Sequence, residues 1–499
     1  MSIRGSPFSF ADNPHYGFQL RVQQPLVLLI LLILSILVSI LIADTRCCGT
    51  NEVTLKAQHQ EACDKMVEFP RMFRVRQRFE GPELADVAGA VESELAGLSL
   101  KERVRPGQAV AITAGSRGIA NIGPILQAAV RHFRQLGAKP FIVPAMGSHG
   151  GGTARGQRNI LESYGITEDF CGCPIRSSMD TVVVCRASEG FPVHFDKQAY
   201  QADHVVVCNR VKPHTLFTGE VESGLMKMML IGLGKHDGAR VYHRAIKDFS
   251  FGQIVGSVAR EVLSKCSILA GLAVVENSYG RTAGIRALRP EALLEEEKAL
   301  LRQARSWMPR LPFQAADILL VDEIGKNISG SGLDLNVVGR KHLGHSPAEH
   351  EVPKIRIIAV RDLSPLTHGS AVGIGTVEFC RRRALEKMDV GMTRVNALTG
   401  GFAMEAMIPL DYPNDREMLQ VMLSQIGLTE PPDARLLWIR NTMSLAEVEC
   451  SAAYLEEARD REDLAILTDP RPLPFSADGN LDDCHMQAGS RRPAVARSD

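Results

Sequence analysis

The chain has 499 residues, which is long enough for two or three globular domains, each with its own hydrophobic core. Lysine plus arginine and aspartate plus glutamate balance at 57 each, so the net charge and the absence of a basic stripe argue against a nucleic-acid partner. Aromatic residues make up only 5% of the chain, too few for a surface on which single-stranded bases stack. The composition therefore favours a small-molecule partner.

The 11 cysteines are scattered along the chain, and none of them forms the C-x-x-C spacing of zinc-ribbon or iron–sulfur sites. Their odd number argues against a complete disulfide framework. Cys185 and Cys208 lie in apolar runs typical of strands, where a thiol is usually an inert core residue. This cysteine usage is typical of a reducing compartment.

An apolar segment precedes the globular part of the chain. Residues 26–43, "LVLLILLILSILVSILIA", carry no charge and just reach the length of a bilayer-spanning helix. We therefore predict that residues 1–65 form an N-terminal segment with a single-pass membrane anchor at 26–43. The alternative is that translation starts at Met66, which would give a protein without this segment.

From about residue 100, short apolar runs alternate with helical segments. Strands are expected at residues 109–113, 140–145, 181–185 and 204–208, and an amphipathic helix is expected at residues 120–137. Continuous valine and isoleucine runs are typical of parallel strands that are covered on both faces. The alternation of strands and helices predicts an α/β layer domain with right-handed crossovers.

A second series of elements begins near residue 267. Interleaved acidic and basic residues predict a helix at 289–307, and buried strands are expected at 267–277, 317–325, 354–363 and 434–442. The fold class is therefore α/β, with two α/β domains that follow the N-terminal hydrophobic helix. We place the domains at residues 66–270 and 271–470, and we expect the polar, proline-bearing tail at 471–499 to be disordered.

Reactive side chains follow three of the predicted strands, where ligands bind in open α/β sheets. Arg117 lies in "AGSRG", His149 in "GSHGGG" and His214 in "KPHTLFTG". An arginine in a strand-to-helix turn is suited to an anion, because backbone N–H groups also point there. Each histidine alone could simply cap a loop, but the three strand ends together indicate a site.

Lys227 lies in the apolar run "SGLMKMMLIGLG", between Met226 and Met228. A lysine in such a run either extends to the surface or lies beside a cofactor, where desolvation makes the amine nucleophilic. The spacing alone leaves both interpretations open.

These motifs together resemble the nickel-dependent lactate racemase family, over about residues 70–450. Members of this family have two α/β domains with the active site in the cleft between them. They use a nickel-pincer nucleotide, a pyridinium-dithio mononucleotide whose two sulfur arms and ring carbon hold nickel. The resemblance implies the same interdomain cleft and cofactor here. Because this cofactor is made in the cytoplasm, the catalytic part is expected to face the cytoplasm, whether it is anchored or starts at Met66.

The resemblance implies a role for each motif. Lys227 would bind the cofactor covalently beside Ser223 and Gly224, and His243, 16 positions later, would complete the coordination of nickel. The acid/base residues would be His149 and His214.

Arg117 would contact both cofactor and substrate. The family has an aspartate three residues before this arginine, where this chain has Ala114, so part of the cofactor or substrate contact differs.

The implied function is a racemase or epimerase of a 2-hydroxy acid, an isomerase that removes a hydride from the alcohol carbon and returns it to either face. Inversion then requires a base on each side of this carbon. The second predicted domain contains "GKNISGSGLDLNVVGR" (325–340), which either closes over a polar substrate or forms a tight structural turn. Its polar residues are Lys326, Asn327, Asp334, Asn336 and Arg340.

Two other functions are compatible with the same residues. A zinc-type metal hydrolase would use His149, His214 and His243 to hold a metal-bound water, but it leaves Lys227 without a role. A catalytically inactive, membrane-anchored binding homologue would explain Ala114.

Overall fold

The computed structural model describes residues 67–116, 118–342 and 344–482. The predicted anchor at 26–43, the alternative start at Met66 and the side chain of Arg117 lie outside these residues, so the anchor stays a prediction. Within the described residues, no helix is both long enough and apolar enough to cross a bilayer.

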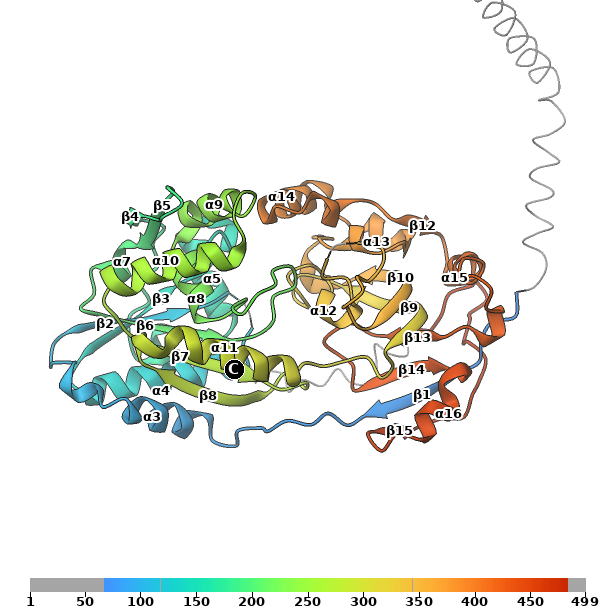
Figure 1. The fold of residues 1–499 in the computed structure, drawn as a ribbon, viewed down its shortest axis with the longest axis horizontal. Helices are drawn as coiled ribbons and strands as arrows, with labels where there is room; N and C mark the ends of the chain where they lie inside the picture. Colours follow the sequence, from blue (N-terminus) through green and yellow to red (C-terminus); the bar gives the residue numbers. More distant parts are fainter. Residues whose placement is uncertain (1–66, 117, 343, 483–499) are drawn as a thin grey trace, which may run out of the picture. The chain divides into compact units, whose positions relative to one another are not determined.

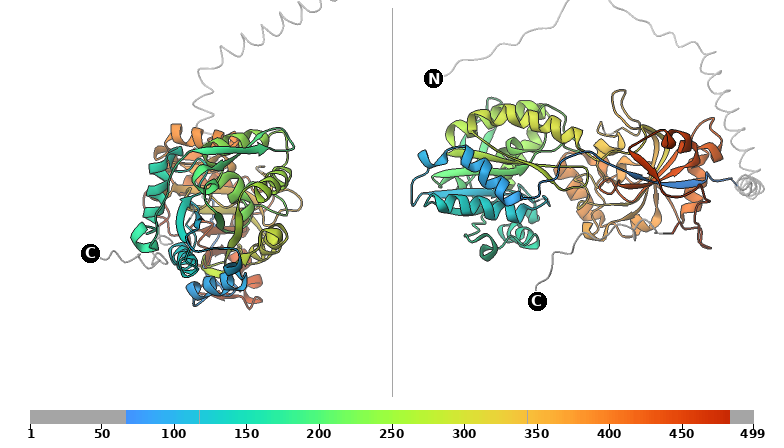
Figure 2. Two further views of the ribbon diagram at one scale, coloured as in Figure 1. Left: turned by 90° about the vertical axis from the view of Figure 1, so that its left-hand side faces the viewer. Right: turned by 90° about the horizontal axis from the view of Figure 1, so that it is seen from below.

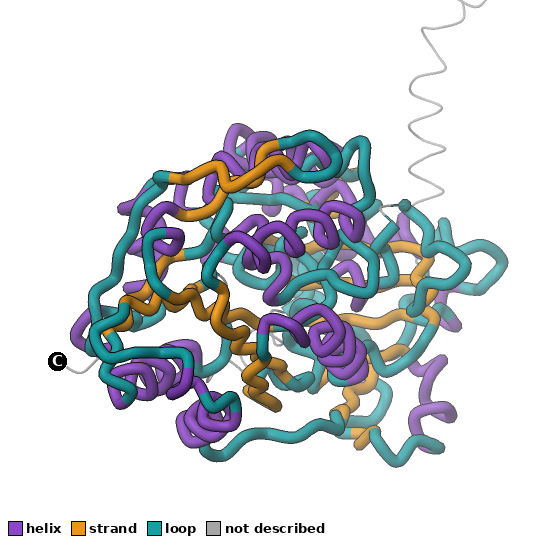
Figure 3. The backbone as a smooth tube through the Cα atoms, turned by 60° about the vertical axis from the view of Figure 1, so that its left-hand side comes forward, coloured by secondary structure: helices purple, strands orange, loops and turns teal. Residues whose placement is uncertain are grey.

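The first sheet has five strands in the order β3-β2-β6-β7-β8, and only β8 runs antiparallel to its neighbour (Figure 1). The strands are β2 (Ala109–Ala114), β3 (Lys139–Pro144), β6 (His204–Arg210), β7 (Ile268–Glu276) and β8 (Thr282–Leu288). The main helices beside this sheet are α3 (Val87–Gly97), α4 (Ile122–Gln135), α5 (Ala154–Ser163), α9 (Lys235–Ala245), α10 (Phe251–Lys265) and α11 (Leu293–Ser306). Figure 3 shows helices on both sides of these strands.

Each face of the first sheet has its own hydrophobic core because successive side chains of a strand point to opposite faces. In β6, Val206 and Cys208 pack with α3 and α4, whereas Val205 and Val207 pack with α10 and α11. This burial on both faces explains the continuous apolar runs of the sequence.

The second sheet has eight strands in the order β12-β11-β10-β9-β13-β14-β1-β15. Its strands are β1 (Met72–Gln77), β9 (Ala315–Ile324), β10 (Lys354–Leu363), β11 (Phe379–Arg381), β12 (Leu410–Tyr412), β13 (Leu436–Ile439), β14 (Glu447–Ser451) and β15 (Leu464–Ile466). β1 pairs antiparallel with both β14 and β15, so the first strand of the described chain lies among the last ones (Figure 2).

Short helices complete the fold. They are α6 (Glu168–Cys171), α7 (Lys197–Tyr200), α8 (Leu225–Lys227), α12 (Leu335–Val338), α13 (Arg382–Glu386), α14 (Val390–Gly400), α15 (Asp415–Leu423) and α16 (Leu455–Arg459). The mixed α/β class predicted from the sequence is confirmed, as are the strands at 109–113, 140–145, 204–208, 317–325 and 354–363, each within a few residues.

Two of the expected strands form, but each belongs to a different sheet from the one that the sequence predicted. Residues 181–185 form β4 (Thr181–Arg186), which pairs antiparallel with β5 (Pro192–Asp196) in a separate two-stranded sheet. The side chain of Val183 is 56% exposed, so this valine run is not covered on both faces. The run at 267–277 is β7 of the first sheet, so the predicted boundary between residues 270 and 271 falls inside a strand.

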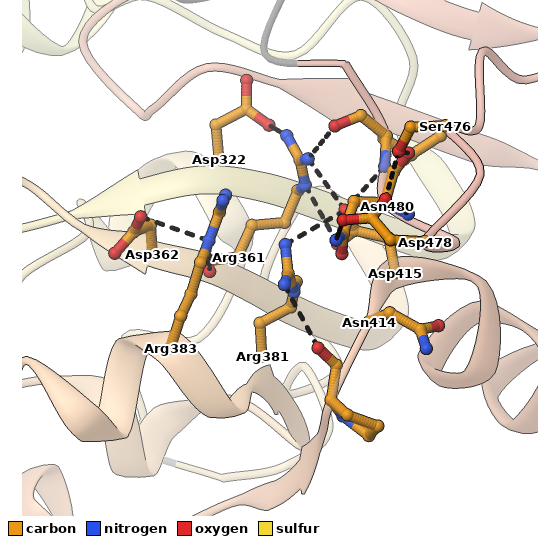
Figure 4. A network of polar contacts seen from close by, with 12 residues as sticks. Asp322, Arg361, Asp362, Arg381, Arg383, Asn414, Asp415, Ser476, Asp478 and Asn480 are labelled. Carbon is orange, nitrogen blue, oxygen red and sulfur yellow. Dashed lines mark hydrogen bonds and ion pairs between the residues drawn. The ribbon is translucent and has the colours of Figure 1, made fainter.

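Residues 471–482, part of the tail that was expected to be disordered, pack against the second sheet. Leu473 and Leu481 are buried. The amide N–H of Leu481 donates to Asp415 at 2.9 Å, and its carbonyl accepts from the buried Arg361 at 2.7 Å (Figure 4). Arg361 also donates to Asp322 Oδ1 at 2.6 Å, so a buried charge network holds this segment in place. Residues 483–499 lie outside the described part of the chain.

Candidate active site

A cavity of about 1420 Å³ brings together most of the residues that the sequence analysis singled out. Its lining includes His149, His214, Ser223, Lys227 and His243, together with loops that follow β2, β3 and β6 and segments of the second half of the chain. The neighbours of Arg117, Ser116 and Gly118, also line it. Ala114 is fully buried, so it lies in the core and not on the cavity wall.

His149 lies in the loop that follows β3, and its Nδ1 is hydrogen-bonded to Ser116 Oγ from the loop that follows β2. The buried Gln157 fixes the backbone of this loop, because its Nε2 donates to Gly147 O at 2.9 Å and to His149 O at 3.3 Å. Gly150 is needed in the same loop: it has a φ of +67°, and a Cβ there would lie 2.5 Å from the backbone of Gly156. The imidazole is therefore held in a defined position at the cavity wall.

A fully buried lysine connects this loop to α9, the helix that carries His243. Lys235 Nζ lies 2.9 Å from Asp196 Oδ2 and donates to the carbonyl of Pro144 at the end of β3. Burial lowers the pKa of Lys235, and the charge of Asp196 opposes this effect. The pair thus ties the start of α9 to the strand end that precedes His149.

His214 is fixed through both its ring and its backbone. Nδ1 accepts hydrogen bonds from the amides of Leu216 at 3.0 Å and Phe217 at 3.1 Å. The imidazole stacks on the Phe217 ring, with 4.3 Å between centroids and 14° between planes. The amide of His214 donates to Glu222 Oε2 at 2.7 Å.

Glu222 joins the His214 loop to other parts of the chain. Its side chain is completely buried and accepts from Arg305 of α11 at 2.7 Å and from Lys341 at 2.8 Å. Truncating this carboxylate would leave two cations and two backbone amides, those of His214 and Gly219, without this partner.

The motif at 325–340 contacts the same loop. Lys326, Asn327 and Asp334 line the cavity, and Asn336 donates to the carbonyl of His214 at 3.1 Å. Arg340 does not take part in this wall: its side chain is fully buried and pairs with Glu378 at 3.3 Å. The motif therefore combines both interpretations, since part of it lines the cavity and part of it is structural.

Lys227 faces the cavity from the end of α8, which continues into a π-helical turn over Met228–Gly232. Met226 and Met228 are buried, and Lys227 Nζ lies 5.6 Å from the centroid of the Phe217 ring. Lys227 therefore lines a cavity large enough for a ligand, and its place beside a cofactor stays a prediction. π-Helical turns of this kind are frequent at functional sites.

The buried carboxyl of Glu297, on α11, caps the start of α8. Its Oε2 accepts from the amide of Met226 at 2.9 Å. A Cβ on Gly224 would lie 2.4 Å from Glu297 Oε1, so only glycine allows this approach. Burial raises the pKa of Glu297 to about 7, although the backbone amides of Met226 and Leu225 favour the charged form.

We expect stability to depend on pH through this carboxyl. Between the ordinary glutamate pKa of 4.5 and the folded-state pKa of about 7, the folded protein holds a proton that the unfolded chain has lost. The free energy of unfolding should therefore fall as pH rises through this window, by about 3 kcal/mol from this group. Chemical denaturation of wild type and Glu297→Gln at pH 5 and pH 8 isolates the effect, because the glutamine cannot titrate. Equal pH dependence in the two proteins would contradict it.

His243 lies on α9 and lines the same cavity. Burial lowers its pKa to about 4, and the charges of Lys227 and Lys247 act in the same direction. The imidazole is therefore neutral near pH 7, which is the form that can bind a metal ion.

The zinc alternative requires His149, His214 and His243 to meet around one ion. Among the described residues, no three histidine, cysteine, aspartate or glutamate side chains gather closely enough to hold a metal. The hydrolase interpretation therefore lacks its ligand set.

Several residues that shape the site were missed in the sequence. Ser116, Phe217 and Glu222 contact the two histidines, and Glu297 contacts the turn that carries Lys227. For Ser116 and Phe217 a signal existed, because each lies within three positions of a predicted site residue. Glu297 is 70 positions from Lys227 and looked like one of several acidic residues on an exposed helix.

The fold and the cavity define an α/β protein in which two histidines from loops after parallel strands share a cavity with a lysine and a histidine from the helices α8 and α9. Residues 73–250 match the family model described as the lactate racemase N-terminal domain. Residues 73–250 are therefore similar to this domain, and the resemblance identified from the sequence is confirmed over a range that contains His149, His214, Lys227 and His243.

The chain is also similar to two solved structures. The lactate racemase apoprotein from Thermoanaerobacterium thermosaccharolyticum is 12% identical, with a TM-score of 0.47 over 74% of this chain and 94% of that chain. A protein from Thermotoga maritima is also 12% identical, with a TM-score of 0.43 over 66% of this chain and 83% of its own. No curated protein matches the chain.

Proposed function

We propose that this protein is a racemase or epimerase of a 2-hydroxy acid that uses a nickel-pincer nucleotide, bound in a cleft between the two halves of the fold. The observation that carries the proposal is the presence of His149, His214, Lys227 and His243 on the wall of one cavity, inside the matched lactate racemase-like domain.

The residues present fit this cofactor. Lys227 offers an amine for a covalent link, and His243 offers a neutral nitrogen for a metal, a donor that suits nickel. The two residues are close enough for the charge of Lys227 to lower the pKa of His243. Ser223 would lie beside the nucleotide, while Gly224 lets α8 approach Glu297. When bound, the cofactor would supply an acceptor for the hydride of the substrate.

The protein's own residues would bind the acid and move its hydroxyl proton. Arg117, next to the lining residues Ser116 and Gly118, would hold an anionic group. His149, placed by Ser116 and Gln157, is positioned to accept a proton. His214 would approach the reacting oxygen from the loop that follows β6.

The test uses the different roles of Lys227 and His243. Intact-mass analysis of the denatured wild-type protein should show an added nucleotide mass, and elemental analysis should show nickel. Lys227→Ala should lose the added mass, whereas His243→Ala should keep it and bind nickel less tightly, because one ligand is removed. Lys247→Ala removes the other neighbouring charge of His243, together with contacts to Gly401 and Phe402, and is the matched control that should keep both.

A Lys227→Ala protein that still carried the nucleotide after denaturation, or wild-type protein holding neither nucleotide nor nickel, would contradict the proposal. Conversion is measured on a panel of chiral 2-hydroxy acids as loss of optical rotation. Racemisation should require the loaded protein.

A further inference from the structure

Two histidines outside the cavity bring their ring nitrogens face to face. His342 and His350 lie in the chain between α12 and β10 (Figure 1), and neither of them lines the cavity of the candidate active site. His342 Nε2 lies 2.8 Å from His350 Nε2. The two rings are almost perpendicular, with 4.7 Å between centroids and 87° between planes. Both residues are exposed, so ions in solution can reach the pair.

The backbone that carries the two histidines is fixed by other residues. The buried carboxylate of Glu351 accepts from the amides of His342 at 2.9 Å and of Ala348 at 2.8 Å, so it joins the two ends of this segment. Lys354, at the start of β10, donates to the carbonyls of Ala348 and Glu349. None of these contacts uses an imidazole. The folded backbone therefore sets the approach of the two rings, and little has to be ordered when the pair binds a ligand.

Two imidazole nitrogens that face each other can share a proton or a metal ion. In the hydrogen-bonded pair, one Nε2 donates to the other, which is a contact of modest strength at an exposed position. A tetrahedral ion at about 2.0–2.1 Å from both nitrogens needs them about 3.3 Å apart, so the rings have to separate by about 0.5 Å. When both nitrogens bind the ion, the shared proton moves to Nδ1 of its own ring, and no proton has to leave the pair.

The surroundings favour a cation that prefers nitrogen ligands. Residues 342–353 contain two glutamates and no lysine or arginine, and the preceding Lys341 is paired with Glu222 at 2.8 Å. Imidazole suits zinc, nickel and copper, whereas calcium and magnesium take oxygen ligands. Because no three candidate ligands gather in the part of the chain that the structure describes, water would fill the other coordination positions.

We propose that His342 and His350 form an exposed site for one divalent transition-metal ion of the zinc, nickel and copper class. The ion is bound through Nε2 of both residues, and Glu351 keeps the two ligands at the required separation. This site is separate from the cofactor proposed for the cavity, and it does not depend on the proposed function.

Zinc binding to the full-length, untagged protein tests the site. Wild type, His342→Gln and His350→Gln are freed of metal with EDTA and titrated with zinc sulfate in a calorimeter at pH 7.5. Each variant should lose one equivalent of bound zinc, because a single imidazole remains. Zinc that binds in the cavity is retained in all three proteins, so the difference counts the exposed site alone. Both residues are exposed, so their unfolding midpoints in EDTA should agree with that of wild type.

His345→Gln is the matched control. His345 is exposed in the same segment, but its Nδ1 is hydrogen-bonded to Glu378 at 3.0 Å and it takes no part in the pair. This variant should keep the equivalent of zinc that the other two lose. Equal zinc stoichiometry and affinity in wild type, His342→Gln and His350→Gln would overturn the proposal, and so would an equal loss in His345→Gln.

Glu351→Ala tests whether the backbone prepares the site. The variant keeps both imidazoles and removes the carboxylate that joins the two ends of the segment. We expect the same zinc stoichiometry with affinity lower by about 10–100-fold, the usual effect of removing a group that orients metal ligands. Wild-type affinity in Glu351→Ala would overturn the role assigned to this carboxylate.

Discussion

Replacing His149 by asparagine is expected to lower turnover by about two to four orders of magnitude, the usual contribution of a positioned acid/base group. The asparagine amide keeps a polar group near Ser116 but cannot take up a proton. The nucleotide mass and the nickel content should be unchanged, because His149 is assigned neither to the covalent link nor to the metal. Single-turnover assays on loaded protein measure the effect.

Ser116→Ala is the companion of this variant. It removes the hydroxyl that is hydrogen-bonded to His149 Nδ1 and leaves the imidazole in place. We expect a smaller loss than for His149→Asn, together with a changed pH–rate profile, because one hydrogen bond of the imidazole is lost. Full turnover in His149→Asn would remove His149 from the mechanism.

Replacing Arg361 by methionine is expected to lower the free energy of unfolding by about 3–5 kcal/mol, because a buried charge is removed from partners that stay buried. Arg361 and both of its carboxylate partners, Asp322 and Asp415, are almost completely buried. The loss should also release the segment around Leu481, which contacts both Arg361 and Asp415. Denaturant unfolding measures the first effect, and limited proteolysis near the C-terminus measures the second.

Arg382→Met is the matched control. This arginine also pairs with a carboxylate, Asp411 at 2.8 Å, but its side chain is 55% exposed. Exposed pairs contribute little to stability, so the variant should unfold close to wild type. Similar losses of unfolding free energy in Arg361→Met and Arg382→Met would show that the buried network stabilises the fold no more than an exposed ion pair does.

Local pattern was sufficient for much of the fold. Valine and isoleucine runs marked β2, β3, β6, β9 and β10, because strands covered on both faces need apolar side chains at every position. The same rule misplaced residues 181–185, whose valines look identical in sequence but lie in an antiparallel pair with Val183 exposed. Strand pairing depends on residues far apart in the sequence, so a run of five residues does not indicate which strand it will pair with.

In the candidate site, too, local sequence pattern indicated some features, and long-range contacts decided the others. Positions after predicted strands marked Arg117, His149 and His214, because parallel strands bring their carboxyl ends to one edge, whereas an apolar run marked Lys227. Some of the partners that hold these residues in place come from distant segments: Glu222 is joined by Lys341, 119 positions away, and the carbonyl of His214 by Asn336, 122 positions away.

The sequence by itself determined the α/β class, the resemblance to lactate racemases and the side chains that we propose for the site. These features depend on residue type and on spacing over a few positions, and both can be read from the sequence without knowledge of tertiary contacts. Only the tertiary structure decided that β1 pairs with β14 and β15, that the tail packs beside Arg361, and that His214 faces two backbone donors while His149 faces a hydroxyl. The reason is physical: which nitrogen of an imidazole holds a proton depends on what lies within about 3 Å of it, and this neighbourhood forms only when the chain folds.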